Sequence, residues 1–196
     1  MALETLPKFI LEHYEVHEWR HACAVLGADF PDELNDLCTV LHGFRLCKSH
    51  IIVGGKGLSK VSMSLDTPFY DLGWLQKKFA TQIKVDDDIR DSPTHSVDCF
   101  KNKVGIEIEW NNKTEFYDRD LNNFRLLFEL RVMSVGVIIT RCDELQDIFD
   151  EIGRGNSYGQ STTILSKLLY RIAGGSGGGC PILVFGITKK LYEETR

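Results

Sequence analysis

The sequence lacks any long apolar run. None approaches the ~18–20 consecutive apolar residues that a membrane-spanning helix needs. The opening stretch, MALETLPKFILEHYEV, also lacks the basic start and the long apolar segment of a signal peptide. From these two absences we expect a protein that makes no membrane contact and resides in the cytoplasm.

Paired cysteines are missing as well. The six cysteines are scattered along the chain, and no two of them form a CxxC pair. Such spacing is typical of reduced thiols in a cytosolic protein, and it argues against a disulfide framework or a cysteine-based zinc site. We therefore expect free thiols at Cys23, Cys38, Cys47, Cys99, Cys142 and Cys180.

The sequence also lacks an excess of positive charge. Lys and Arg number 23 against 28 Asp and Glu, which gives a formal net charge of −5. A general nucleic-acid coat protein is expected to have a basic balance, so this class is disfavoured. A nuclease is not excluded, because an acidic metal site and acidic helices can coexist with a local basic cleft.

The length and composition fit one globular domain. A chain of 196 residues, 43% hydrophobic and 26% charged, is long enough to bury a proper core. We expect a single domain over residues 1–196, mainly helical over about 1–90. Apolar spacing and turn residues predict helices over Leu6–Leu26, Leu34–Leu41 and Phe69–Phe79, an extended run at Ile51–Val53, a glycine loop around Lys56, and a turn-prone stretch over Lys84–Pro93.

Strands and helices alternate in the second half of the chain. Two almost wholly apolar runs, Val135–Ile139 and Pro181–Ile187, predict buried central strands. The order from residue 95 is β-β-α-β-α-loop-α-β, which predicts the α/β class with a mixed central sheet flanked by helices. The expected helices are Leu121–Arg131, with Asp118 or Asp120 as N-cap, Asp143–Ile152 and Ile164–Ile172.

Three carboxylates follow the pattern of a β-hairpin. Two short extended runs, Ser96–Phe100 and Val104–Trp110, flank Asn102-Lys103, which can serve as a two-residue turn. If this turn closes the hairpin, residues whose numbers sum to 205 face each other, so Asp98 faces Glu107. Side chains alternate along a strand, so Glu109 points to the same side as Glu107.

Like charges set opposite one another destabilise a sheet, and a divalent cation would relieve the repulsion. Hard oxygen ligands favour Mg²⁺ or Mn²⁺ over zinc. The alternative is a solvated acidic face. Ile106 and Ile108 alternate with the glutamates, so the hairpin has one buried side and one acidic side. From the pattern alone, both readings stay open.

Histidines and glycines form two further patterns. His13, His17 and His21 would stack on one face of the first helix at zinc-like spacing, but a solvated or interface face is the favoured interpretation. Gly174–Gly179 leads from a helix into a strand and lacks the P-loop lysine, so it is interpreted as a connector. Gly153–Thr163 is dense in small hydrogen-bonding side chains that suit either a polar loop or contacts with DNA.

These segments together resemble a known family. Asp98, then Glu107 and Glu109 within VGIEIEW, resemble the catalytic hairpin of type II restriction endonucleases of the BglII/BstYI group, to which BamHI is more distantly related within the PD-(D/E)xK nuclease superfamily. The resemblance continues through FYDRDLNNFRLLFEL, MSVGVIITRCDEL, SYGQSTT and CPILVFGI. It covers roughly the last hundred residues and implies a restriction-endonuclease-like fold with its catalytic and DNA-recognition core over about 91–196.

The resemblance implies a nuclease that depends on Mg²⁺, with Mn²⁺ as a substitute. Carried over by position, Asp98, Glu107 and the carbonyl of Ile108 would bind the metal. Glu109 occupies the slot that holds lysine in most of the superfamily, glutamine in BglII and BstYI, and glutamate in BamHI. Glu109 is therefore a catalytic candidate, either as a metal ligand or as a proton acceptor.

The resemblance also implies that double-stranded DNA is the substrate. A palindromic site, with GATC as its expected core, would be read by a homodimer, with the Leu121–Arg131 helix in the interface, and a cognate methyltransferase would protect the host. A structure-selective or repair nuclease of the same superfamily and a non-catalytic DNA-binding module remain as alternatives. The candidate DNA contacts are Asn111, Asn112, Lys113, Ser157, Tyr158, Gln160, Ser161 and Thr162.

Overall fold

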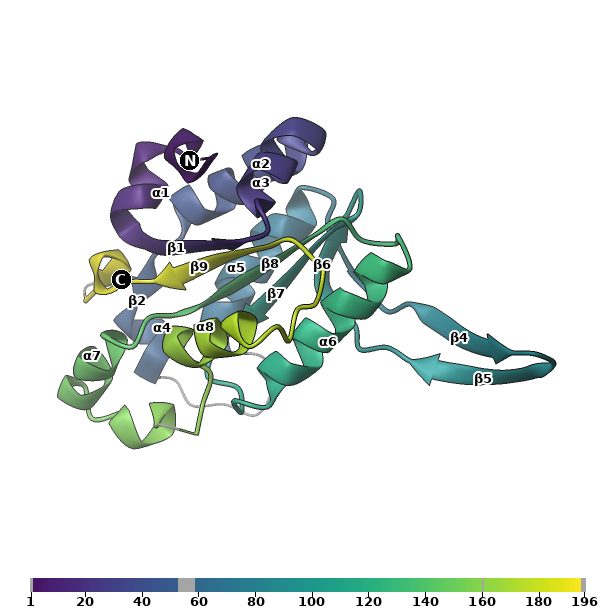
Figure 1. Ribbon diagram of the computed structural model, residues 1–196. Coiled ribbons are helices and arrows are strands. Elements are labelled where there is room, and N and C mark those ends of the chain that lie inside the picture. The colour runs from purple at the N-terminus through teal and green to yellow at the C-terminus, as the bar shows by residue number, and fades with distance from the viewer. Residues whose placement is uncertain (1, 53–58, 160, 195–196) are drawn as a thin grey trace.

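A six-stranded mixed sheet forms the centre of the computed structural model, which describes residues 2–52, 59–159 and 161–194 (Figure 1). Strands β7, β8 and β9 run parallel, whereas β1, β6 and β3 are each antiparallel to the neighbour that they pair with. The predicted α/β class with a mixed sheet is confirmed. From one edge to the other, the strands are β1 (Tyr14–Trp19), β9 (Ile182–Ile187), β8 (Val135–Arg141), β7 (Val104–Glu109), β6 (Val97–Lys101) and β3 (Leu75–Lys77).

The two predicted central strands are confirmed. Every residue of β8 and of β9 is buried, as expected of apolar strands covered on both faces. Parallel neighbours need crossover connections, and helices provide them between β7 and β8 and between β8 and β9. The predicted element order after residue 95 is therefore the observed one.

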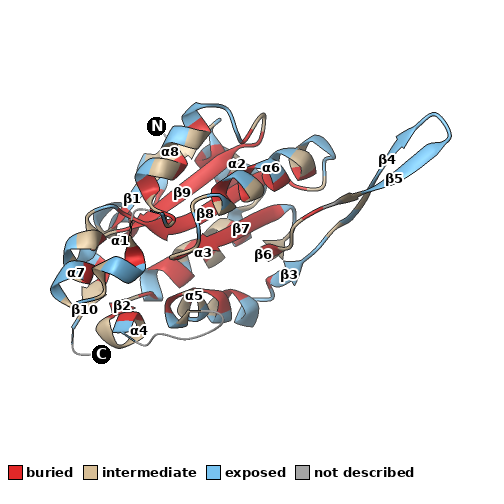
Figure 2. Ribbon diagram, turned by 90° about the horizontal axis from the view of Figure 1, so that it is seen from below, coloured by how far each residue is buried: buried red, intermediate tan, exposed pale blue. Residues whose placement is uncertain are grey.

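Helices cover both faces of the sheet, and the buried residues concentrate between these layers (Figure 2). On one face, α6 and α8 pack through a cluster that includes Phe124 and Leu168. On the other face, the N-terminal helices and α7 pack against residues such as Ile106 and Phe185. The helices are α1 (Lys8–His13), α2 (Ala22–Asp29), α3 (Pro31–Gly43), α4 (Lys48–Ile52), α5 (Lys60–Asp71), α6 (Phe116–Glu129), α7 (Leu145–Glu151) and α8 (Leu165–Ala173).

Short elements complete the described part of the chain. A small parallel pair, β2 (Leu46–Cys47) and β10 (Tyr192–Glu193), joins the C-terminal segment to the end of α3 and the start of α4. The 3-10 helices are η1 (Ala2–Thr5), η2 (Gly155–Tyr158) and η3 (Lys189–Leu191).

Two glycines allow α6 to approach the sheet closely. Gly105 of β7 lies opposite Gly136 of β8. A Cβ on Gly136 would lie 2.3 Å from Cδ2 of Phe124, and one on Gly105 would lie 2.7 Å from Sδ of Met133. A larger residue at position 136 would therefore push α6 away from the sheet. The close approach seats the middle of α6 on the amino-terminal ends of β7 and β8.

The N-terminal segment is not the single helix predicted over Leu6–Leu26. Helix α1 ends at His13, and the next six residues form β1, in which Val16 lies opposite Phe185 of β9. Strand pairing prevails because it satisfies the backbone groups along an edge of β9 that would otherwise be unpaired. His17 lies in β1, and His21 precedes α2 with φ 57°, so the three histidines do not stack on one helix.

Other predictions before residue 95 have mixed outcomes. The Leu34–Leu41 helix is confirmed as part of α3. The prediction of a helix over Phe69–Phe79 is wrong, because α5 already ends at Asp71. Gly73, with φ 84°, then turns the chain into β3. Ile51 and Ile52 belong to α4 and are not extended. Val53 and the glycine loop around Lys56 lie outside the described residues.

The stretch Lys84–Pro93 is a strand pair and not the expected run of turns. Strands β4 (Ala80–Val85) and β5 (Asp88–Pro93) form a separate antiparallel hairpin that projects from the body (Figure 1). Val85 is 64% exposed and Ile89 is 59% exposed, because this hairpin has no second layer to bury its apolar side chains. We call residues 80–93 the arm.

Two expectations from the sequence concern the cysteines and membrane-spanning helices. The six cysteines, all within the described residues, are thiols outside any disulfide bond, as predicted, and five of them are buried. Within residues 2–52, 59–159 and 161–194, no helix has the length and apolar character needed to cross a membrane.

Candidate active site

The acidic hairpin has the predicted register. Cys99 pairs with Ile106 and Lys101 pairs with Val104, so the residue numbers of facing positions sum to 205. Asn102 and Lys103 have φ angles of 43° and 68°, as a type I′ turn requires at its two central positions. The prediction of this hairpin from the Asn-Lys pair is confirmed.

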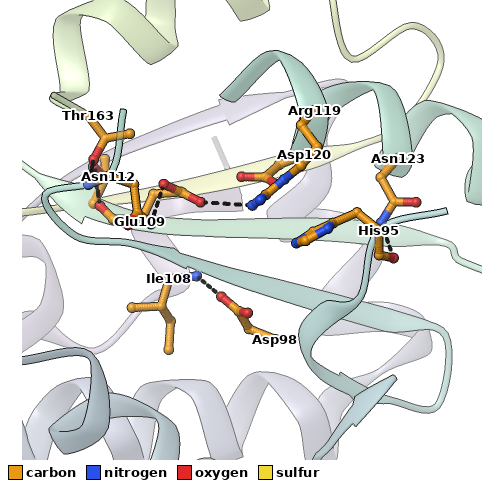
Figure 3. Close-up of polar contacts among 10 residues, drawn as sticks. His95, Asp98, Ile108, Glu109, Asn112, Arg119, Asp120, Asn123 and Thr163 are labelled. Atoms are coloured by element: carbon orange, nitrogen blue, oxygen red, sulfur yellow. Dashed lines mark hydrogen bonds and ion pairs between the residues drawn. The ribbon is translucent and has the colours of Figure 1, made fainter. Parts of the chain in front are cut away.

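Glu107 and Glu109 lie side by side on the side of β7 that faces α6. They are 0% and 1% exposed. Asp98 of β6 turns toward the neighbouring strand, where its Oδ2 accepts a hydrogen bond of 3.0 Å from the backbone N–H of Ile108 (Figure 3). The hairpin thus brings the three predicted carboxylates to adjacent positions of β6 and β7.

Glu107 is buried without compensation. Neither of its carboxylate oxygens has a hydrogen-bond partner among the described residues. Burial raises the pKa of Glu107 well above its usual value, and the negative charges of Asp120, Asp98 and Glu109 raise it further. A buried charge is normally paired or bound to a metal, so this carboxylate needs a cation or a proton.

Glu109 is held by three neighbours. Nδ2 of Asn112 donates to Oε2 of Glu109 at 2.9 Å, and Nη2 of Arg119 lies 3.4 Å from Oε1 (Figure 3). Burial raises the pKa of Glu109 to about 9, and the charge of Asp120 and a hydrogen bond between the two carboxyl groups add to the rise. In the absence of a cation, burial and the neighbouring Asp120 therefore favour the protonated form of Glu109.

The three carboxylates do not form a ligand cage by themselves. No group of three or more His, Cys, Asp or Glu side chains in the described ranges is arranged to hold a metal ion. Asp98 is turned to Ile108, and Glu109 to Asn112 and Arg119. The unpartnered oxygens of Glu107 nevertheless fit a hard cation, with Asp98 and the Ile108 carbonyl as further oxygen donors.

A cleft of about 780 Å³ opens beside this hairpin. Its wall combines acidic groups from β6 and β7 with positive groups from α5, α6 and the segment after α7. Acidic and basic side chains thus occur together in one cleft of a chain whose formal net charge is −5. The cleft is lined, among others, by Lys60, Asp98, Glu109, Asn112, Arg119 and Arg154.

Three residues of the site were not predicted. Asp66 of α5 lines the cleft near Asp98, and burial, followed by the charge of Asp98, raises its pKa to about 7. Asp120 is fully buried against Glu109, and Arg119 lies within 2.8 Å of it. The expectation of Asp118 or Asp120 as N-cap is wrong, because Glu115 holds that position. Only the packing of α5 and α6 onto the sheet brings these residues to the hairpin.

The two predicted DNA-contacting segments lie next to each other. Lys113 and Thr162 form an antiparallel β-bridge, although 49 positions separate them in the sequence. Ser157 and Ser161 are exposed, whereas Tyr158 is buried with its ring stacked on Phe149 at 4.1 Å. Asn111 and Asn112 line the cleft. Gln160 lies outside the described residues.

The comparison with known families agrees with this geometry. The model of the family described as restriction endonuclease BglII/BglIII matches residues 14–187, which include the hairpin, the cleft and both DNA-contact segments. The curated proteins include none with a significant match to this sequence. Because the family match covers most of the 196 residues, the chain belongs to the BglII/BglIII family of restriction endonucleases.

Proposed function

We propose that this chain is a homodimeric type II restriction endonuclease that hydrolyses phosphodiester bonds of double-stranded DNA at a short palindrome. The family supports a type II restriction nuclease in general. The observation that carries the proposal is the carboxylate of Glu107, buried without a partner among the described residues beside a cleft that also holds basic side chains. Buried ionisable groups with strongly perturbed pKa values cluster at functional sites.

The proposed cofactor is Mg²⁺, for which Mn²⁺ can substitute. Asp98, Glu107 and the carbonyl of Ile108 are the groups that would hold it, since they offer the hard oxygen donors that these ions prefer. When bound, the cation supplies positive charge beside the scissile phosphate and Lewis acidity toward water. A cation held there would offset the burial and the negative charges of Asp120, Asp98 and Glu109 that together raise the pKa of Glu107.

The remaining groups of the site neutralise negative charge and orient the Glu109 carboxylate. Arg119 can offset the negative charge of a phosphate in the cleft, because its side chain is 31% exposed and lines the cleft with its positive guanidinium group. Glu109 stands at the position of the superfamily lysine, and once ionised it can accept a proton from an attacking water. Asn112 and Arg119 fix its orientation for that role. In this assignment, Glu109 acts on the proton rather than as a metal ligand.

Recognition is assigned to the segments that flank the cleft. Asn111, Asn112 and Lys113 follow the catalytic strand, and Ser157, Tyr158, Ser161 and Thr162 belong to the adjacent loop. Gln160, outside the described residues, is proposed as a contact from its place in the sequence alone. Amides and hydroxyls can bond base edges, and lysine can bond phosphates. A site centred on GATC is the proposed target, and a methyltransferase that modifies the same site is the proposed partner in a cytoplasmic restriction system.

Digestion of plasmid DNA tests this proposal. With Mg²⁺, the protein should cut plasmids into discrete fragments whose sequenced ends share one palindrome. Asp98→Asn and Glu107→Gln should abolish cutting and retain duplex binding, while Asp71→Asn, at the exposed end of α5, should cut normally. Cutting of branched DNA alone would support the structure-selective nuclease instead. Duplex binding without any cutting, unchanged in the Asp98 variant, would support the non-catalytic module.

The homodimer requires a separate measurement. Sedimentation should give a mass twice that of the 22.3 kDa chain, at least in the presence of the palindromic duplex. Charged substitutions at the exposed C-terminal end of α6, such as Leu130→Glu just after the helix, should weaken the dimer if that helix lies in the interface, since Leu130 is half exposed. A monomer that cuts both strands with full activity would exclude the symmetric arrangement.

A further inference from the structure

The loop that is proposed to read DNA is hydrogen-bonded directly to the end of the catalytic strand. Residues 112–114 and 161–163 run antiparallel, with the N–H of Thr163 donating to the carbonyl of Asn112 at 2.8 Å and the N–H of Thr114 donating to that of Ser161 at 3.0 Å. The hydroxyl of Thr114 also donates to the Ser161 carbonyl, at 2.9 Å. We call these two segments the bridge.

Thr163 lies where the bridge meets the catalytic strand. Its side chain is fully buried, and its hydroxyl accepts a hydrogen bond from the N–H of Asn112 at 3.2 Å (Figure 3). The same hydroxyl donates to the carbonyl of Glu109 at 3.5 Å. One side chain of the reading loop therefore contacts the backbone of both Glu109 and Asn112, three residues apart.

Asn112 continues the connection to the carboxylate itself. Its backbone is bound to Thr163 in both directions, and its side-chain amide donates to Oε2 of Glu109 at 2.9 Å. A shift of Thr163 would move Asn112, and with it the donor that orients the Glu109 carboxylate. Of the two side chains on this path, that of Thr163 is buried and that of Asn112 is partly buried.

The loop is also fixed from beneath by a buried arginine. Nη2 of Arg141, at the end of β8, donates to the carbonyl of Tyr158 and to the hydroxyl of Thr162, both at 2.7 Å. Its guanidinium lies 5.3 Å from the ring centre of Phe149 and 5.7 Å from that of Tyr158. The described loop is thus tied to the sheet on one side and to Asn112 on the other, so that it moves with the site as one body.

We propose that Thr163 is a positioning residue that couples the seating of the reading loop on DNA to the placement of Glu109. The inference rests on the proposed function and adds a mechanism of specificity to it. A loop seated on its own base sequence holds Asn112 and Glu109 in place. A loop displaced by a wrong base moves them, so discrimination appears in the cleavage rate as well as in affinity.

Thr163→Val tests the coupling, because it removes the hydroxyl and keeps the branched shape. Single-turnover cleavage rates and duplex affinities are measured on the preferred site and on a site with one base pair changed. The variant should keep the affinity ratio of the unmodified protein, while its ratio of cleavage rates falls about tenfold, the size of one or two lost hydrogen bonds. Thr163→Ser keeps the hydroxyl and should restore the rate ratio to within about twofold.

A second variant covers the case in which Thr163→Val does not fold. Thr114→Val removes the hydroxyl that donates to the Ser161 and Thr162 carbonyls at a partly exposed position, and it should lower the rate ratio in the same direction. Thr188→Val is the matched control. It removes a comparable bond, from the Thr188 hydroxyl to the His13 carbonyl, two strands away from Glu109. This control should leave both ratios unchanged.

The outcomes separate the coupling from the proposed function. If the unmodified protein cuts at a site and Thr163→Val keeps its rate ratio, the coupling is rejected and the proposed function stands. If the affinity ratio falls as much as the rate ratio, Thr163 acts on binding alone and the coupling is again rejected. If the unmodified protein cuts no duplex, the proposed function is rejected, and the coupling with it.

Discussion

The carboxylate of Asp98 and the backbone N–H of Ile108 are joined across the acidic hairpin by a hydrogen bond of 3.0 Å. This bond turns Asp98 toward the residue that separates Glu107 from Glu109. It sets the direction of Asp98 independently of any cation, because the donor belongs to the main chain. The charge of Asp98 and its bond to Ile108 can therefore be separated by substitution.

Asp98→Asn and Asp98→Ala should differ in stability, although both are expected to abolish DNA cutting. Asparagine retains an oxygen that accepts the Ile108 bond, whereas alanine leaves the N–H of Ile108 without it, at an expected cost of about 1 kcal/mol. Thermal and urea unfolding in EDTA measure the difference. Equal stability of the two variants would mean that the bond contributes nothing to folding.

Glu107→Gln should stabilise the protein at alkaline pH while it abolishes cutting. The folded-state pKa of Glu107 is raised above its usual value of 4.5, so its contribution to stability is present below that pH and is lost as pH rises. In EDTA, unfolding free energies from pH 5 to pH 9 should therefore fall for the unmodified protein and fall less for the variant. Glu129→Gln, at an exposed position of α6, should follow the unmodified curve.

Divalent cations should raise the melting temperature, and more so at pH 8 than at pH 5. A ligand that binds only the folded state adds about 2.7 kcal/mol of stability at a concentration 100 times its Kd. Scanning calorimetry with Mg²⁺, Mn²⁺ or EDTA measures the shift. Glu107→Gln should remove most of it, because the unpartnered carboxylate that attracts the ion is gone. A shift of the same size in this variant would place the ion elsewhere.

Gly136→Ala should destabilise the fold and disturb the site through α6. The added Cβ would lie 2.3 Å from Cδ2 of Phe124, and such overpacking costs about 1–3 kcal/mol. The double variant Gly136→Ala with Phe124→Leu should recover part of that loss, because the smaller side chain makes room. Urea unfolding of the four proteins of this cycle gives the coupling energy. Additive effects would show that the contact does not limit the packing of α6.

The sequence predicts best those features that depend on neighbouring residues. The register of the acidic hairpin follows from the Asn102-Lys103 turn and from strand alternation, both of which are local. The buried strands β8 and β9 follow from apolar runs too short and too continuous for other elements. These features account for the confirmed fold class and for the position of Glu107 and Glu109.

The sequence predicts poorly what depends on distant partners. Tyr14–Trp19 forms a strand because β9, more than 160 residues later, offers an edge to pair with. Asp66 and Asp120 reach the site only because α5 and α6 pack on β6 and β7, and nothing in their local sequence distinguishes them from surface residues. The orientation of Glu109 likewise depends on Arg119, a helix residue.

The arm differs physically from the rest of the chain. A lone two-stranded hairpin is marginally stable in water, and most residues of this one are exposed. The backbone N–H groups of residues 80–93 should therefore exchange with deuterium through frequent local opening, while those of β7, β8 and β9 exchange only on global unfolding. Protection against exchange should therefore be low in the arm and high in the central sheet. A protease should likewise cleave the arm well before it cleaves the strand that carries Glu107.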